Sequence, residues 1–292
     1  MNTLPSLFIS HGSPMLLLQD GAARRFLAEL GRTLPRPQAI LVVSAHWENA
    51  RKPAVSFTSK PETIHDFGGF PQELYEKQYP APGAPALAAK AQALLEKGGF
   101  SVARYGERGL DHGAWVPLSL MYPEADISVI QVSLIEDGTP ERHEKMGRAL
   151  RSLRDEGVLI IGSGSLTHNL YEFRGQPVDA PVQDWVSEFM VWMETSLKEN
   201  RRDDILHYRS RAPSGKRNHP TEEHLSPLFV ALGAAGNKPA VEKLHSSVEY
   251  GVIAMDVYAF MPDAHDEEAD DTSVTEKRGL LHFLPKVFFT RS

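Results

Sequence analysis

Short apolar runs alternate along the chain with amphipathic stretches, and this alternation predicts the secondary structure. Strands are expected at residues 7–9, 39–44, 54–58, 101–104, 127–134 and 158–161, with one or two more at 248–260. Helices are expected at residues 22–30, 84–96, 140–156, 181–199, 203–210 and 221–233. The run AILVVS at residues 39–44 is almost wholly apolar, as strands buried on both faces are. The pattern therefore predicts an α/β fold, in which a mostly parallel sheet flanked by helices on both faces forms a three-layer α/β/α sandwich.

Composition divides the chain into a long body and a short end. Residues 1–262 are expected to form one catalytic α/β domain, because 292 residues are near the upper limit for a single hydrophobic core. Residues 263–271 (DAHDEEADD) are densely acidic, and residues 280–289 (LLHFLPKVFF) are apolar again. We therefore expect residues 263–292 to be an acidic linker, solvated and disordered, followed by an apolar C-terminal tail.

Bulk composition argues against several classes of function. The net charge is −7 and no Lys/Arg block stands out, so we expect no nucleic-acid partner. No run approaches eighteen apolar residues and the first residues lack a signal-peptide pattern, so we expect no membrane association and a cytoplasmic location. The chain has no cysteine, which excludes disulfides and thiolate metal sites.

Histidine is the residue type that points to chemistry. Of the twelve histidines, His11, His46 and His168 follow three of the predicted apolar strands, and His112 and His224 lie in loops beside predicted helices. Ligands of an open parallel sheet bind beyond the carboxyl ends of its strands, so these imidazoles can meet in one crevice there. Imidazole without thiolate suits Fe(II), Zn(II) or Mn(II). The sequence thus predicts one divalent-metal site at the carboxyl ends, with scattered structural histidines as the alternative.

A long stretch rich in Gly and Pro, residues 64–83, predicts a functional loop. We expect its His65, Phe67 and Phe70 to line a substrate pocket, with a structural hydrogen-bonding role as the competing interpretation for His65.

Other motifs have simpler interpretations. Glu223, next to His224, is interpreted as an acid favoured by a helix N-terminus, and His143 is expected at the surface. Ser163 lacks the G-x-S-x-G frame of a nucleophile elbow, and the sequence holds neither HExxH nor a nucleotide-binding glycine motif.

Six segments together resemble a known family. They are FISHGSP (8–14), LPRPQAILVVSAHWE (34–48), TIHDFGGFPQELYEKQYPAPG (63–83), LDHGAWVPL (110–118), LTHNL (166–170) and PTEEHLSPL (220–228). In this order they resemble the class III, LigB-like extradiol ring-cleavage dioxygenases of the 4,5-DOPA extradiol type. The resemblance covers roughly residues 4–260, and the tail has no counterpart in it.

The resemblance implies a metal site and its residues. One non-haem metal would bind His11, His46 and His224, with His224 where related class III enzymes use a glutamate. His168 would lie beside the metal as an acid/base catalyst or a fourth ligand, and His112 would be a second catalytic histidine of the pocket. Fe(II) is expected for activity, and Zn(II) is possible in a structure.

The resemblance also implies a reaction. The enzyme would open the ring of a small aromatic diol, a catechol such as DOPA, with O₂ to a muconic semialdehyde. A zinc-dependent hydrolase on the same histidines and a non-catalytic binding homologue are the alternatives. The sequence makes no prediction of the oligomeric state.

Overall fold

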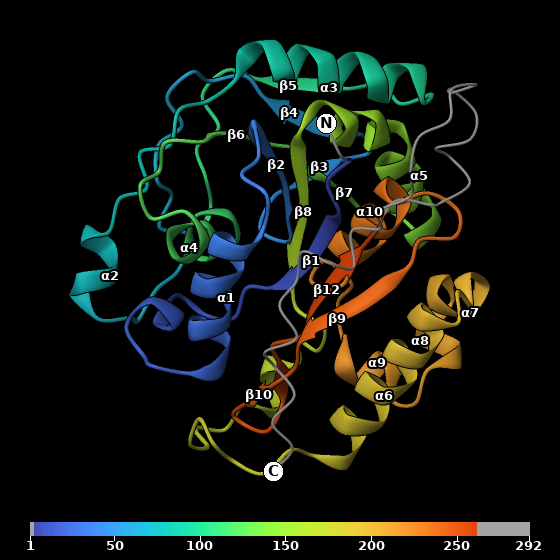
Figure 1. The fold of residues 1–292 in the computed structure, drawn as a ribbon. Coiled ribbons are helices and arrows are strands. Elements are labelled where there is room, and N and C mark those ends of the chain that lie inside the picture. Colours follow the sequence, from blue (N-terminus) through green and yellow to red (C-terminus); the bar gives the residue numbers. More distant parts are fainter. Residues whose placement is uncertain (1–2, 262–292) are drawn as a thin grey trace.

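A six-stranded sheet forms the centre of the protein (Figure 1). The computed structural model describes residues 3–261, so the predicted linker and tail lie outside the described residues. The strands lie in the order β6 (Ser128–Gln131), β2 (Ala39–Ser44), β8 (Val158–Gly164), β1 (Ser6–Ser10), β12 (Val257–Phe260) and β9 (Val241–His245). The first four run parallel, whereas β12 is antiparallel to both of its neighbours. The prediction of a mostly parallel sheet is confirmed.

Three further two-stranded sheets are separate from the central sheet. They are β3 (Glu48–Ala50) with β7 (Leu134–Glu136), β4 (Ala54–Ser56) with β5 (Ala103–Tyr105), and β10 (Val248–Glu249) with β11 (Ile253–Ala254). The first two pairs are parallel and the third is antiparallel.

Helices cover both faces of the sheet, which confirms the three-layer arrangement (Figure 1). One face carries α1 (Ala22–Thr33) and α4 (His112–Met121), and the other carries α5 (Pro140–Leu150) and α10 (Ser226–Ala234). The remaining helices are α2 (Gln72–Glu76), α3 (Pro85–Lys97), α6 (Asp184–Lys198), α7 (Arg202–Leu206), α8 (Tyr208–Arg211) and α9 (Gly215–Asn218). Short 3₁₀ turns lie at η1 (Pro14–Leu17), η2 (Arg151–Glu156) and η3 (Leu170–Glu172). No helix among residues 3–261 is long and apolar enough to cross a membrane.

Alternation along the central strands divides the core between the two faces. In β1, Leu7 and Ile9 pack in the cluster that contains α1 and α4, whereas Phe8 packs on the opposite face. In β8, Ile161 lies on the first face and Ile160 on the second. Because both faces are covered, β1, β2 and β8 bury nearly all of their side chains, at about 1.5–3 kcal/mol for a large aliphatic residue.

Several predicted elements differ from the structure. The strand predicted at 127–134 divides into β6 and β7, and the helix predicted at 221–233 begins only at Ser226. Strand β9 was not predicted, since its sequence VEKLH is half-buried and mixes polar with apolar residues. The prediction that His143 lies at the surface is wrong: the residue is buried, and its Nε2 accepts a hydrogen bond from the Ile135 N–H at 3.1 Å.

Candidate metal centre

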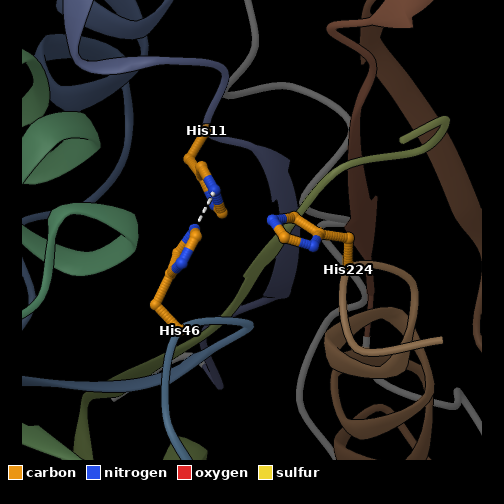
Figure 2. Close-up of side chains that lie close together, drawn as sticks. All are labelled: His11, His46 and His224. Carbon is orange, nitrogen blue, oxygen red and sulfur yellow. Dashed lines mark hydrogen bonds between the residues drawn. The ribbon is translucent and has the colours of Figure 1, made fainter. Parts of the chain in front are cut away.

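A group of histidines lies at the carboxyl edge of the sheet. His11 directly follows β1, and His46 lies two residues beyond the end of β2. Ser10 pairs with Gly164 and Ser44 pairs with Ser163, so these strands end at the same level. Figure 2 shows the rings of His11, His46 and His224 facing a common centre. The strand-end histidines converge as expected: His11 and His46 face each other, and the His168 ring lies against that of His224.

His224 reaches the same centre from the segment just before α10. Its carbonyl oxygen accepts a hydrogen bond from the Ser165 N–H at 2.8 Å, immediately after β8. A Cβ at Gly164 would lie 2.1 Å from that carbonyl oxygen, so only glycine lets the two segments approach this closely. The end of β8 therefore positions His224 although this histidine follows no strand itself.

The three rings are close enough to share one ion. His11 Nε2 and His46 Nε2 lie 3.0 Å apart, and one nitrogen from each of His11, His46 and His224 lies within 4.8 Å of the other two. Two imidazole nitrogens that bind one metal at about 2.1 Å and at a right angle are separated by about 3 Å. The spacing of the donors thus fits a single divalent metal.

Hydrogen bonds at the outer nitrogens fix two of these rings. The Ser163 hydroxyl donates its hydrogen to the Gly113 carbonyl, so it must accept from His11 Nδ1–H at 3.0 Å. His224 Nδ1 donates in the same way to Glu223 Oε1 at 2.8 Å. Each imidazole therefore presents an unprotonated Nε2 to the centre, which is the arrangement of a metal-binding histidine.

Burial favours the uncharged form of His11, His46 and His224. Desolvation, followed by the neighbouring imidazoles, lowers the pKa of His11 and of His224 well below the usual 6.5. Desolvation and His112 lower the pKa of His46 to about 4. Metals bind the neutral form of imidazole, so these rings are in the required protonation state at neutral pH.

His168 lies against His224 on the side of Glu223. The His168 and His224 rings stack at 3.4 Å with an angle of 10°, and the backbone N–H of His168 donates to the Asn218 carbonyl at 3.0 Å. The ligand atoms of His168, Glu223 and His224 also lie within 4.8 Å of one another. Desolvation lowers the pKa of His168 as well. The choice between ligand and acid/base catalyst stays a prediction.

His112 is the first residue of α4 and lies next to His46. The two ring centroids are 3.9 Å apart, and His112 Nδ1 lies 3.0 Å from Asp66 Oδ1. Burial opposes ionisation of Asp66, but hydrogen bonding to His112 outweighs it and lowers the pKa of Asp66 to about 2. A carboxylate therefore borders the imidazole cluster.

Aromatic residues of the long loop border the site beyond His112. Phe67 lies 5.8 Å from the His112 ring and 5.3 Å from Phe70, measured between centroids. The His65 ring lies 5.7 Å from Trp115 and its Nε2 contacts the Lys77 carbonyl at 3.0 Å. His65 therefore makes a hydrogen-bond contact within the loop, and Phe67 is the loop aromatic beside His112.

Sequence reasoning missed three residues that orient the cluster. The sequence around Ser163 bears only on a nucleophile role, which its frame does not support, and the motif of the long loop gives Asp66 no role of its own. The interpretation of Glu223 as a helix N-terminal acid is wrong, because α10 begins three residues later and the carboxylate instead accepts from His224. Position beside a histidine is the only sequence signal that Asp66 and Glu223 share.

Comparisons with known proteins cover nearly all of the described residues. The model of a protein family described as the catalytic LigB subunit of aromatic ring-opening dioxygenase matches residues 5–261. A 4,5-DOPA dioxygenase extradiol of Beta vulgaris is 45% identical over 265 residues, which cover 89% of this chain and 97% of the relative. The enzyme of that name from Escherichia coli K12 is 39% identical over 255 residues, 86% of this chain and 93% of the relative. The crystal structure of an uncharacterized Escherichia coli K12 protein has a TM-score of 0.75 and 35% identity, covering 88% of this chain and 99% of that one.

Proposed function

This chain belongs to the family of the catalytic LigB subunit of aromatic ring-opening dioxygenases, and we propose that it opens a catechol such as DOPA with O₂ at an Fe(II) centre on His11, His46 and His224. By family and by its relatives it is an extradiol ring-cleaving dioxygenase. The observation that supports the proposed centre best is the set of three neutral imidazoles, two of them held so that Nε2 faces inward.

The donor set suits a divalent metal and leaves room in its coordination for substrate. Three protein ligands are typical of catalytic rather than structural sites. When bound, Fe(II) would act as a Lewis acid toward the diol oxygens and could also exchange electrons with O₂. Zinc can act as a Lewis acid but cannot change its oxidation state. The proton transfers of the reaction depend on side chains of the protein itself.

We assign His168 as the base that accepts a proton from a diol hydroxyl. Its lowered pKa keeps it neutral at pH 7, and its stacking on His224 puts it beside the centre. The base role requires a free ring nitrogen, whereas a ligand role would use that nitrogen for the metal. Replacement of His168 by Ala separates the two: loss of turnover with metal retained supports the base, and loss of metal supports the ligand.

We assign His112 to the binding of O₂, and the residues of the long loop to the binding of the substrate ring. His112, held beside Asp66, would donate a hydrogen bond to O₂ or to a developing oxygen anion. His65, Phe67 and Phe70 would form the apolar wall that binds the flat ring and keeps water out. Ring cleavage between a hydroxyl-bearing carbon and its neighbour, with both oxygen atoms retained, would give the muconic semialdehyde.

The test is turnover with a defined metal. The protein is stripped, loaded anaerobically with Fe(II), and mixed with a panel of catechols that includes DOPA while O₂ uptake and visible absorbance are followed. We expect one O₂ per ring and a yellow product, and none from a Zn(II)-loaded sample. Absence of O₂ uptake across the panel, with iron verified in the protein, would contradict the proposal. Ester or amide hydrolysis by the zinc form without O₂ would favour a hydrolase instead.

A further inference from the structure

One carboxylate, that of Asp66, lies between two imidazoles of the cluster. Its Oδ1 is 3.0 Å from His112 Nδ1, and its Oδ2 is 3.7 Å from His46 Nδ1. The same Oδ1 accepts a hydrogen bond from the His112 backbone N–H at 2.9 Å. Ligand atoms of all three residues lie within 4.8 Å of one another.

The contacts of Asp66 join three separate segments of the chain. Asp66 belongs to the long loop and has His65 and Phe67 as its neighbours, whereas His46 follows β2 and His112 begins α4. Its contact with the His112 N–H satisfies one of the unpaired donors at the start of α4 and anchors the loop there. The carboxylate therefore holds the loop against the end of the sheet.

Among residues 3–261, the carboxylate nearest to His46 Nδ1 is that of Asp66. Ser163 orients His11, and Glu223 orients His224. His46 Nδ1 instead lies 3.7 Å from Asp66 Oδ2. The other acid beside this histidine, Asp111, is fully buried and holds Ser44 and Gln131 at 2.6 and 2.8 Å. Asp66 is therefore the carboxylate placed to orient the outer nitrogen of His46.

We propose that Asp66 is a positioning residue that orients His46 and His112 with one carboxylate and ties the aromatic loop to the metal centre. The inference rests on the proposed function only in taking His46 as a ligand. An oriented N–H···carboxylate contact fixes the tautomer of a ligating imidazole and makes its other nitrogen a better donor. Loss of such a partner commonly weakens metal binding by about 10–100-fold.

Three variants of Asp66 separate its contributions. Asp66→Asn keeps an oxygen that can accept from the His112 N–H but removes the negative charge, and Asp66→Ala removes both. Asp66→Glu keeps the carboxylate charge on a side chain one methylene longer. Glu62→Gln is the matched control, since it removes one charge from an exposed side chain of the preceding segment.

The primary measurement is metal affinity of the stripped protein, which requires no turnover. Co(II) binding is measured against a competing chelator, together with the visible spectrum of the bound ion. We expect about 10-fold weaker binding in Asp66→Asn, weaker still in Asp66→Ala, partial recovery in Asp66→Glu and no change in Glu62→Gln. Melting temperatures of the metal-free proteins establish that each variant is folded.

Unchanged Co(II) affinity and spectrum in both Asp66→Asn and Asp66→Ala would overturn the proposal. It would also be overturned by a loss of affinity that Asp66→Glu does not recover, because that result assigns the residue a structural role alone. Should the wild-type iron form open no catechol while the Asp66 series still follows the expected order, the proposed function fails and this inference stands. With Fe(II) saturating, a fall in kcat that exceeds the change in KM for the diol is the expected kinetic result.

Discussion

Gly113 is packed so tightly against the histidine cluster that a single methyl group should disturb it. A Cβ at this position would lie 2.4 Å from Ser44 Oγ, 3.0 Å from His46 Cδ2 and 3.2 Å from His11 Cε1. The residue lies in the first turn of α4, where alanine is more favourable than glycine by up to about 1 kcal/mol. Replacement of Gly113 by Ala therefore tests packing at the site without a penalty from helix propensity.

The expected size of the effect follows from these distances. Carbon atoms pack at about 3.5–4.0 Å, so the two imidazoles must each retreat by about 0.5 Å and the Ser44 hydroxyl by about 1 Å. Ser44 cannot move freely, because it is buried and bonded to Asp111 at 2.6 Å. A site that must hold its geometry to about 0.5 Å should then lose about 10–100-fold in metal affinity. Overpacking costs about 1–3 kcal/mol, part of which the helix propensity offsets, so the protein should remain folded.

The assay compares metal binding with folding in the same variant. Co(II) affinity is measured by chelator competition, and the free energy of unfolding by urea titration of the metal-free protein. Gly68→Ala is the matched control, because no atom lies within 4 Å of the added methyl group and the backbone is not left-handed. Wild-type Co(II) affinity in Gly113→Ala would refute the argument that His11 and His46 bind the metal in the positions described.

Three further outcomes test other parts of the structure. Phe67→Ala should raise KM for the catechol several-fold in steady-state kinetics and leave the metal content unchanged, because its ring contacts His112 but none of the proposed ligands. Arg154→Ala should lower the free energy of unfolding by about 3–5 kcal/mol in urea, since the buried guanidinium bonds the carbonyls of Leu4 and Ala234 at 2.6 Å each. Desolvation and Arg142 lower the pKa of His143 to about 4 from the 6.5 of an unfolded chain, so between these values the unfolded chain binds more protons and stability falls as the pH falls. His143→Gln should therefore lose less stability than wild type between pH 6.5 and 4.5, as measured by urea titration at both values.

The central fold was predictable because periodicity and burial agree there. The run at residues 39–44 forms β2 with the predicted bounds, and residues 7–9 and 158–161 form the middle of β1 and the first part of β8. Strand β9 escaped prediction because it lies at the sheet edge, where half-buried positions tolerate polar side chains. His143 was misplaced because charged neighbours in sequence indicate an exposed helix face, while the ring itself turns inward to cap the Ile135 N–H.

The candidate site was predictable only where a strand end fixes a side chain. His11 and His46 follow parallel strands, so topology alone brings them together. His224 depends on how the segment before α10 packs on Gly164, and local sequence does not determine that contact. Asp66 and Glu223 escaped for the same reason, since their roles come from tertiary contacts with rings far away or from the point at which a helix begins.

Anomalous diffraction from crystals of the anaerobic Fe(II) protein, recorded at the iron edge, tests the shared metal centre most directly. We predict one strong peak about 2.1 Å from a ring nitrogen of each of His11, His46 and His224. A peak bound instead by His168, Glu223 and His224 alone, or iron spread over sites away from His11 and His46, would contradict the account.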